Sequence, residues 1–308
     1  MTTSFGIIII GDEILSGKRA DKHLPKTIEL LKARGLALSY ADYVGDDPAR
    51  ITATLVRAFA AARAFGDVVF SCGGIGATPD DHTRQCAAAA LGVGLALHPQ
   101  AKTLITSRMQ DVAKEQGVAF EPDRHDNIHR LNMGVFPTGA QIIPNPYNKI
   151  PGFSCFVEGK SSSNQQGSRD WLGQTVGAAA PLGGSDPHEV GERGGLHFLP
   201  GFPVMAWPMI EWVLDTYYSH LHQTEAYIEK SIIVFGSMEA TLTPLMLDIE
   251  ASHPGVKVFS LPSVDHATYG RHIELGVKGA PDAVAVAYPA LLAGLGNFDY
   301  PLGPELVR

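Results

Sequence analysis

The feature that most constrains this chain is a strand, a glycine-rich turn and a helix start in direct succession over residues 67–83, DVVFSCGGIGATPDDHT. The apolar run from Val68 to Phe70 has the length and residue types of a buried parallel strand. The strand is followed by glycines, which let the backbone turn tightly and approach a ligand closely: Gly73, Gly74 and Gly76. Thr78 and Pro79 then predict the N-cap and the first position of a helix over 79–90.

This succession predicts an anion site, because free backbone N–H groups and the positive end of a helix dipole face the same point. Asp80 and Asp81 come at the same place in the chain. Carboxylates repel a bound phosphate unless a divalent cation bridges the two. The run therefore predicts a phosphate site at which Asp80 and Asp81 hold a metal ion.

A purely structural role for these acids explains the same pattern. Asp81 follows Thr78 by three residues, which is the spacing of a variant capping box. Acidic residues in the first turn of a helix also stabilise it through its dipole, without taking part in any chemistry. Because neighbouring helical residues point in different directions, we do not expect both carboxylates to serve as caps.

The first part of the chain alternates between strands and helices. Strands are predicted over 4–10, 36–44 and 68–70, and helices over 21–34, 48–65 and 79–90. Such alternation implies a mostly parallel sheet with right-handed crossovers, whose ligands bind beyond the carboxyl ends of the strands. Asp12 and Glu13 follow the first strand directly, so we expect them at the same edge of the sheet as the glycine turn.

Residues up to about 222 continue this first domain. Short strands are predicted over 141–143 and 197–199, and Pro200-Gly-Phe-Pro203 predicts a turn that opens a helix over 204–219. The N-terminus of that helix is a second candidate anion site. Residues 159–195 are small, polar and aperiodic, which predicts a flexible insertion.

The pattern changes at about residue 223. Strands are predicted over 228–235, 257–261 and 271–278, and helices over 242–251 and 282–295. This order indicates a small α+β domain with a mixed or antiparallel sheet. We therefore predict two domains, 1–222 and 223–308.

Composition limits the partners and the compartment. A formal net charge of −8 argues against general nucleic-acid binding, which needs a basic face. Three cysteines without a CxxC pair predict a reducing compartment and no zinc site. Neither a signal peptide nor an apolar stretch of about 20 residues is found, so we expect a cytoplasmic protein without membrane contact.

Other polar residues are weaker candidates. His125 and His129 have the i, i+4 spacing of a metal pair on a helix, but no third ligand is evident and a solvated face is favoured. Cys72 is favoured as a small buried residue over a nucleophile. His82 is expected on a helix surface, and Lys149 is expected either to neutralise a phosphate or to be an ordinary loop lysine.

The two segments Gly11–Gly17 (GDEILSG) and Gly73–Thr83 together resemble the molybdopterin-binding (MoaB/MogA-like) domain family. The resemblance is closest to its CinA (competence/damage-inducible protein A) branch. Asn145-Pro146 with Pro151-Gly152, and the later Pro200–Pro203, are similar to the remaining signatures of that branch. The chain from residue 228 onward resembles the small domain that follows in the same group.

The resemblance implies a three-layer α/β/α fold with a mostly parallel sheet that binds a pterin or nucleotide phosphate. The implied phosphate-binding residues are Gly73, Gly74, Gly76 and Thr78, with Asn145 and Gly201 completing the pocket. Asp80 and Asp81 would serve metal and phosphate chemistry, and Asp12 and Glu13 would line the opposite wall. Related domains commonly form homo-oligomers, which we also expect here.

Two departures from the family pattern matter. Members of the CinA branch often continue into a nicotinamide-mononucleotide deamidase domain, which we do not expect here because the sequence stops at Arg308. The insertion at 159–195 falls between two pocket signatures, where it could act as a lid or displace Gly201.

The leading hypothesis is metal-dependent hydrolysis of a nucleotide pyrophosphate such as ADP-ribose or FAD. Mg²⁺, Mn²⁺ or Co²⁺ at Asp80 and Asp81 would activate water, and the glycine N–H groups would stabilise developing charge. Asp12 or Glu13 would orient the water or add a metal ligand. The alternatives are adenylyl transfer to molybdopterin and nucleotide or pterin binding without catalysis.

Overall fold

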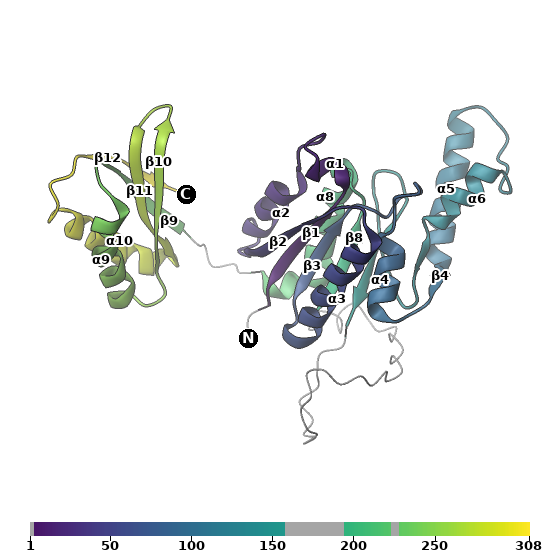
Figure 1. Ribbon diagram of the computed structural model, residues 1–308, viewed down its shortest axis with the longest axis horizontal. Coiled ribbons are helices and arrows are strands. Elements are labelled where there is room, and N and C mark those ends of the chain that lie inside the picture. The colour runs from purple at the N-terminus through teal and green to yellow at the C-terminus, as the bar shows by residue number, and fades with distance from the viewer. Residues whose placement is uncertain (1–2, 158–193, 223–227) are drawn as a thin grey trace, which may run out of the picture. The chain divides into compact units, whose positions relative to one another are not determined.

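The computed structural model of this chain describes residues 3–157, 194–222 and 228–308 (Figure 1). The chain divides into two compact units, Met1–His222 and Gln223–Arg308. Nearly all of the insertion predicted at 159–195 lies outside the described residues. Among the described helices, none combines the length and the apolar character needed to cross a bilayer.

A sheet of six strands forms the centre of the first unit, in the order β2-β1-β3-β8-β7-β6. Four strands run parallel: β1 (Phe5–Ile10), β2 (Leu38–Val44), β3 (Val68–Cys72) and β8 (Gly195–Leu199). Next to β8, β7 (Gly152–Phe156) runs antiparallel, and β6 (Gln141–Ile143) reverses again. The carboxyl ends of β1, β2, β3, β8 and β6 therefore meet at one edge, where β7 begins.

Helices cover both faces of this sheet, which explains why β1, β3 and β8 are buried along their whole length. On one face, α2 (His23–Lys32) and α8 (Pro203–Tyr217) pack on Ile7 and Ile9 of β1. On the other face, α3 (Pro48–Phe65), α4 (Thr83–Leu91) and α5 (Pro99–Glu115) share a core with Ile8 and Phe198. The predicted three-layer α/β/α architecture is confirmed.

Helix starts follow the sequence signals in one case and not in another. The predicted start of α3 is confirmed: the Asp47 side chain accepts the Arg50 N–H at 2.8 Å, and Pro48 occupies the first turn. The predicted start of α4 at Pro79 is wrong, because the helix begins at Thr83. The Asp81 carboxylate binds Thr78 and closes a separate turn ahead of the helix.

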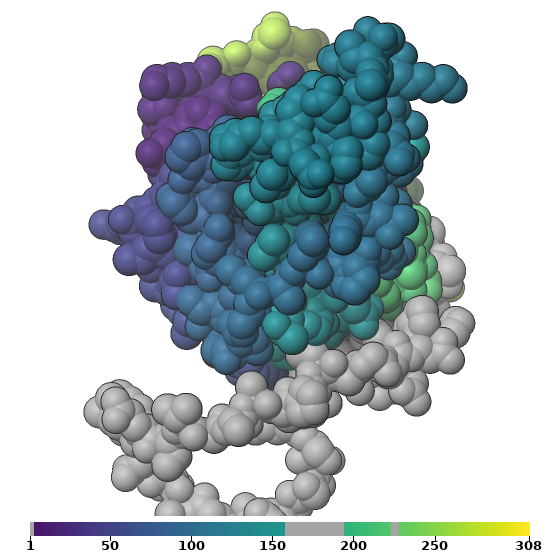
Figure 2. All heavy atoms as spheres, turned by 90° about the vertical axis from the view of Figure 1, so that its right-hand side faces the viewer, coloured from purple at the N-terminus to yellow at the C-terminus, as the bar shows by residue number. Residues whose placement is uncertain are grey.

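Smaller elements of the first unit were not predicted as such. They are α1 (Asp12–Leu15), β4 (Leu95–Leu97), α6 (His125–Asn132), β5 (Val135–Pro137) and the short 3₁₀ helix η1 (Ser219–Leu221). The long helix α5 and the strand β7 were not predicted either. β4 and β5 pair antiparallel beside α5 and α6. Figure 2 shows the face of the unit on which α5 and α6, coloured blue to teal, lie.

The second unit is an antiparallel sheet with two helices. Its elements are β9 (Ile228–Phe235), α9 (Glu239–Ser252), β10 (Lys257–His266), β11 (Gly270–Gly279), α10 (Pro281–Leu295) and β12 (Leu302–Val307). The strand order is β10-β11-β9-β12, and both helices share its core with Leu275 and Val277. The predicted α+β class is confirmed, and β12 is an addition that the sequence analysis missed.

Candidate functional site

The loops singled out from the sequence come together at the carboxyl edge of the first sheet. Loops after β1, β2, β3, β6 and β8 all leave the sheet there, since these strands point the same way. Backbone hydrogen bonds link neighbouring loops to the adjacent strands, from Gly11 N–H to the Val44 carbonyl and from Gly73 N–H to the Leu199 carbonyl, both at 3.0 Å. This is the edge at which open α/β sheets bind ligands.

Gly73 and Gly74 are required by close packing at this edge. Gly73 has φ +113°, and a Cβ there would lie 2.2 Å from the Ile10 carbonyl oxygen. Gly74 has φ +67°, and its Cβ would lie 2.1 Å from Oγ1 of Thr83. The glycine turn therefore sits against β1 and the first residue of α4, in a conformation that side chains rarely adopt.

Asp80 and Asp81 have different roles in the turn that follows β3. Oδ2 of Asp81 accepts the Thr78 N–H at 2.7 Å and the Thr78 hydroxyl at 2.5 Å, so Asp81 closes the turn 78–81. Asp80 is exposed at the same turn. The neighbouring Thr78 side chain is the main reason why the pKa of Asp80 lies below its ordinary value. Asp80 is thus a free carboxylate at neutral pH, while Asp81 has the structural engagement that the capping alternative describes.

The side chains of Asp12 and Asp46 each accept a hydrogen bond from the backbone N–H of the other residue. The Asp12 N–H donates to Oδ2 of Asp46 at 2.9 Å, and the Asp46 N–H donates to Oδ1 of Asp12 at 3.2 Å. Burial raises the pKa of Asp46, and the charges of Asp12, Glu13 and Asp80 raise it further against the effect of the Asp12 hydrogen bond. Carboxylates from the loops after β1, β2 and β3 therefore share one electrostatic environment.

Sequence reasoning missed Asp46 because Asp46-Asp47-Pro48 looked like a helix start, and Asp47 is indeed the cap. The signal that could have found Asp46 is its position directly beyond the carboxyl end of β2. An acid at that position lies at the same edge as Asp12 and Asp80 in a parallel sheet.

Two arginines bring positive charge to the same loops. Arg84 is 5% exposed and donates from Nη1 to the Ile75 carbonyl at 2.6 Å, beneath the glycine turn. Burial lowers its pKa, and the charge of Asp81 opposes this. Arg19 lies 3.8 Å from Oε1 of Glu13, and its guanidinium carbon is 5.8 Å from the centre of the Phe202 ring.

Gly201 and Phe202 belong to the loop between β8 and α8. Gly201 approaches the glycine turn so closely that a Cβ on it would be 3.5 Å from Cα of Gly73. His23, at the start of α2, donates from Nε2 to the Gly201 carbonyl at 3.0 Å, and burial lowers its pKa. The Phe202 ring stands 57% exposed, which is unusual for a phenylalanine and leaves a flat apolar face at this edge.

Asn145 lies at the expected edge, but its side chain is used inside its own loop. Nδ2 donates to the Asn148 side chain at 2.8 Å and to the Ile150 carbonyl at 2.9 Å, while Oδ1 accepts the Tyr147 N–H at 3.0 Å. The same loop contains Lys149, whose Nζ pairs with Asp111 of α5 at 2.5 Å. Asn145 therefore shapes the loop after β6, and Lys149 ties that loop to α5.

The weaker candidates from the sequence analysis either lie away from the carboxyl edge or have no reactive group available. His125 and His129 contact each other on α6 with their Nε2 atoms 3.2 Å apart. Across the described ranges, no three or more His, Cys, Asp or Glu side chains lie together so that they could hold a metal ion. Burial raises the pKa of the Cys72 thiol, which keeps it protonated, and His82 precedes α4 without capping it.

Comparison with known proteins points to one family. A family model described as "Probable molybdopterin binding domain" matches residues 6–220. A CinA-like protein of Mycobacterium tuberculosis (strain ATCC 25618 / H37Rv) is 26% identical over 285 residues, which cover 91% of this chain and 56% of that protein. A CinA-like protein of Anaeromyxobacter sp. (strain K) is 32% identical over 148 residues, 48% of this chain and 33% of that protein.

The chain thus spans about half of the length of such curated relatives, or less. Among solved structures, the protein CinA from Thermoplasma acidophilum matches with a TM-score of 0.48 and 21% identity, over 70% of this chain and 97% of that one. The family model covers more than two thirds of the 308 residues, including every loop at the carboxyl edge. The chain belongs to the molybdopterin-binding domain family.

Proposed function

We propose that the chain hydrolyses the pyrophosphate bond of a nucleotide such as ADP-ribose or FAD, with a divalent cation, at the carboxyl edge of its first sheet. The observation that carries this proposal is the reciprocal contact of Asp12 and Asp46, which brings carboxylates from two separate loops together at this edge. Burial raises the pKa of Asp46, and the charges of Asp12, Glu13 and Asp80 raise it further. Carboxylates from separate loops repel one another, so their convergence costs stability unless a cation binds among them. A phosphate bound beside them needs the same cation.

The residues fit a cation that is only partly held by protein. Mg²⁺ typically binds one or two carboxylates and completes its shell with water and substrate phosphate. Asp80 is exposed and ionised, and Asp81 uses only Oδ2 for the turn, so these two residues would hold the ion. The spacing of the described acids does not fit a complete cage of three or more protein ligands.

The bound cation would neutralise the pyrophosphate and lower the pKa of an attacking water. The backbone would stabilise the charge that develops on the non-bridging oxygens. Within the described part of the chain, the N–H groups of Gly74, Ile75 and Gly76 donate to no other group, whereas that of Gly73 is used by Leu199. Arg84 supports this row of donors by holding the Ile75 carbonyl. Asp12 or Glu13 would orient the water and accept its proton.

The family assignment favours a second candidate, which is binding of a pterin phosphate with or without adenylyl transfer. This function would use the same glycine turn, and Arg19 beside Phe202 would face the ligand. It differs in its chemistry, because adenylyl transfer consumes ATP and joins two molecules. Binding without catalysis would release no product at all.

The test is incubation of the purified chain with ADP-ribose, FAD or NAD and Mg²⁺, Mn²⁺ or Co²⁺, followed by measurement of AMP. We expect metal-dependent AMP release that chelator abolishes and that Asp80→Asn reduces at least tenfold. Asp123→Asn, an exposed aspartate just before α6, is the matched control and should behave as wild type. No AMP with any substrate and metal would exclude the hydrolase, and tight binding of a pterin phosphate would then favour the second candidate.

A further inference from the structure

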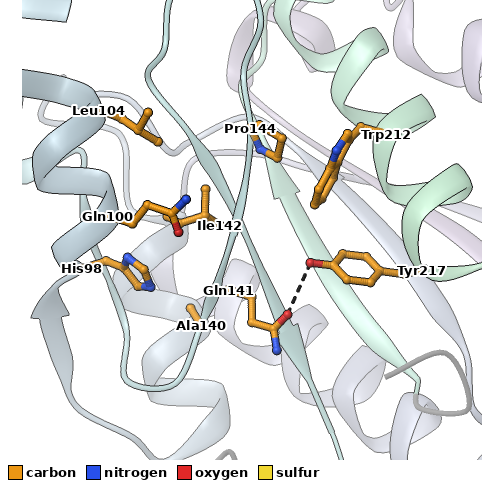
Figure 3. Close-up of a pocket in the computed structure, with 9 residues that line it drawn as sticks. All are labelled: His98, Gln100, Leu104, Ala140, Gln141, Ile142, Pro144, Trp212 and Tyr217. Atoms are coloured by element: carbon orange, nitrogen blue, oxygen red, sulfur yellow. Dashed lines mark hydrogen bonds between the residues drawn. The ribbon is translucent and has the colours of Figure 1, made fainter. Parts of the chain in front are cut away.

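A cavity of about 430 Å³ opens on the flank of the first sheet, away from the glycine turn. It lies beside the edge strand β6, between the start of α5 and the second half of α8 (Figure 3). The side chains that decide its chemistry are His98, Gln100, Leu104, Gln141, Trp212 and Tyr217. No residue of the glycine turn or of the acidic loops lines it, so it is a site separate from the one proposed above.

The walls of the cavity suit a flat ring. Trp212 and Tyr217 lie on one side in Figure 3, with Leu104 on the other and Ile142 of β6 between them. Trp212 and Tyr217 contact each other edge to face, with ring centres 5.4 Å apart. A dry engineered cavity of about 150 Å³ already holds benzene, so this volume admits a bicyclic ring.

The cavity is polar but uncharged. Among the described residues that line it, none is an aspartate, glutamate, lysine or arginine. Burial lowers the pKa of His98 and raises that of Tyr217 to about 12, so both are neutral near pH 7. A charged ligand would lose its hydration without finding a counter-charge, which excludes phosphates, carboxylates and amines as tight ligands.

The polar groups that line the cavity favour a ligand that carries both a hydrogen-bond donor and a hydrogen-bond acceptor. His98 contributes its ring to the wall, since its Nδ1 is buried and is not exposed to a ligand in the cavity. Tyr217 donates to Oε1 of Gln141 at 3.3 Å, which leaves the Gln141 amide nitrogen to donate elsewhere. The Gln100 amide is directed toward the same space in Figure 3. Each glutamine amide carries a donor beside an acceptor, so a ligand with an N–H beside a C=O can pair with it.

We propose that this cavity binds a small, uncharged, planar heterocycle that carries an N–H donor next to a carbonyl acceptor, which is the chemistry of a lactam or carboxamide ring. The aromatic walls take the faces of the ring, and the two glutamine amides pair with its polar edge. The proposal does not depend on the pyrophosphatase hypothesis, because the two sites share no residue. The ring of a free metabolite and the ring of a larger nucleotide are both admitted by an opening at the surface.

The test compares two ring systems of equal size by saturation-transfer NMR and calorimetry with the full chain. Quinazolin-4-one carries the lactam, and quinoline lacks both the N–H and the carbonyl. We expect quinazolin-4-one to bind with a dissociation constant at least tenfold lower than that of quinoline. Trp212→Ala and Gln141→Leu should each weaken quinazolin-4-one at least fivefold, since each removes one wall or one polar partner of the ring.

Two controls separate this site from other causes. Trp207→Phe changes a tryptophan of the same helix that does not line the cavity, and should leave binding unchanged. Asp80→Asn should also leave it unchanged while altering the proposed AMP release. Equal binding of the two rings, or no binding of either, would overturn the proposal. It would also be overturned if light scattering shows an oligomer that Trp212→Ala dissociates, because a second copy would then occupy the cavity.

Discussion

The N–H of Asp12 points to Oδ2 of Asp46 while the N–H of Asp46 points to Oδ1 of Asp12, at 2.9 and 3.2 Å. This reciprocal pair fastens the loop after β1 to the loop after β2. It also places two like charges side by side, and Glu13 and Asp80 add to them. The edge of the sheet therefore carries an electrostatic cost that backbone hydrogen bonds offset only in part, and this cost can be measured.

Asp46→Asn should stabilise the fold at neutral pH. The raised pKa of Asp46 means that its protonated form is favoured by folding, so its stabilising contribution is lost as pH rises through the folded pKa. Asparagine keeps the acceptor for the Asp12 N–H and removes the charge. We expect an increase in Tm of about 1–3 °C at pH 7 from ~0.5–1 kcal/mol. This increase shrinks as pH falls through the raised pKa of Asp46 and is gone below the ordinary pKa of 3.8. Thermal scans between pH 3 and 8 give the answer, and an unchanged Tm at pH 7 would contradict the shared environment.

Asp81→Asn and Asp81→Ala should separate a metal ligand from a turn-closing residue. Asparagine retains an oxygen that can accept from Thr78, whereas alanine leaves the Thr78 N–H and hydroxyl without it. If Asp81 holds the cation, both variants lose at least tenfold in AMP release. If it only closes the turn, the asparagine variant retains most activity and the alanine variant alone is impaired. Steady-state rates at saturating metal distinguish the two results.

His23 should act as a positioning residue for the Gly201 loop. Its lowered pKa means that the unfolded chain binds the proton more tightly, so stability falls as pH drops below the ordinary value of 6.5. His23→Gln preserves an N–H donor and should abolish this part of the pH dependence with little loss of AMP release. His23→Leu removes the hydrogen bond to Gly201 and should lower kcat several-fold at any pH. Equal kcat values for the two variants would show that the hydrogen bond from His23 to Gly201 does not position the loop.

The exposed ring of Phe202 should contribute to binding of substrates that carry a planar base. Stacking on an aromatic side chain is worth ~1–3 kcal/mol per base. Phe202→Ala should therefore raise KM for ADP-ribose about fivefold or more with little change in kcat, and Phe202→Trp should restore it. Val204→Ala, in the next turn and also exposed, serves as the control and should leave KM unaltered.

Gly73→Ala should destabilise the protein more than Gly92→Ala. Both glycines have positive φ, +113° and +70°, which costs an alanine ~1–3 kcal/mol. Only at Gly73 would the new methyl group also meet a backbone atom, the Ile10 carbonyl oxygen at 2.2 Å, whereas nothing lies within 4 Å at Gly92. Chemical denaturation of the two variants measures the difference, and equal losses would show that the packing against β1 can relax.

The sequence was sufficient for the features that depend on local patterns. The apolar run of β1, the Asp47-Pro48 start of α3 and the alternation in the C-terminal unit all follow from residue type and spacing. The start of α4 could not be predicted, because Thr78-Pro79 is a good helix start in isolation and only the folded turn shows that Asp81 binds Thr78. The His23–Gly201 contact joins residues 178 positions apart, and no local pattern contains that information.

The candidate site divides in the same way. Asp12 and the glycine turn were placed at one edge by the rule for parallel strands, and the strand order agrees with it. Gly201 was assigned to the same pocket only through the family resemblance. Asp46 and Arg84 were missed because each has a plain local explanation, as a residue before a helix cap and as an ordinary helical arginine. Their environment depends on packing between loops, which the sequence does not display.

Because β7 and β8 run in opposite directions, the connection between them lies at the edge of the sheet opposite the glycine turn. Val157, after β7, and Gly194, before β8, are joined by a hydrogen bond at 3.1 Å at the edge opposite the glycine turn. Gly201 lies seven positions after Gly194 in the sequence, yet β8 spans the sheet between them. In evolutionary terms, the two ends of this connection lie where a change in its length would not by itself move the loops at the carboxyl edge.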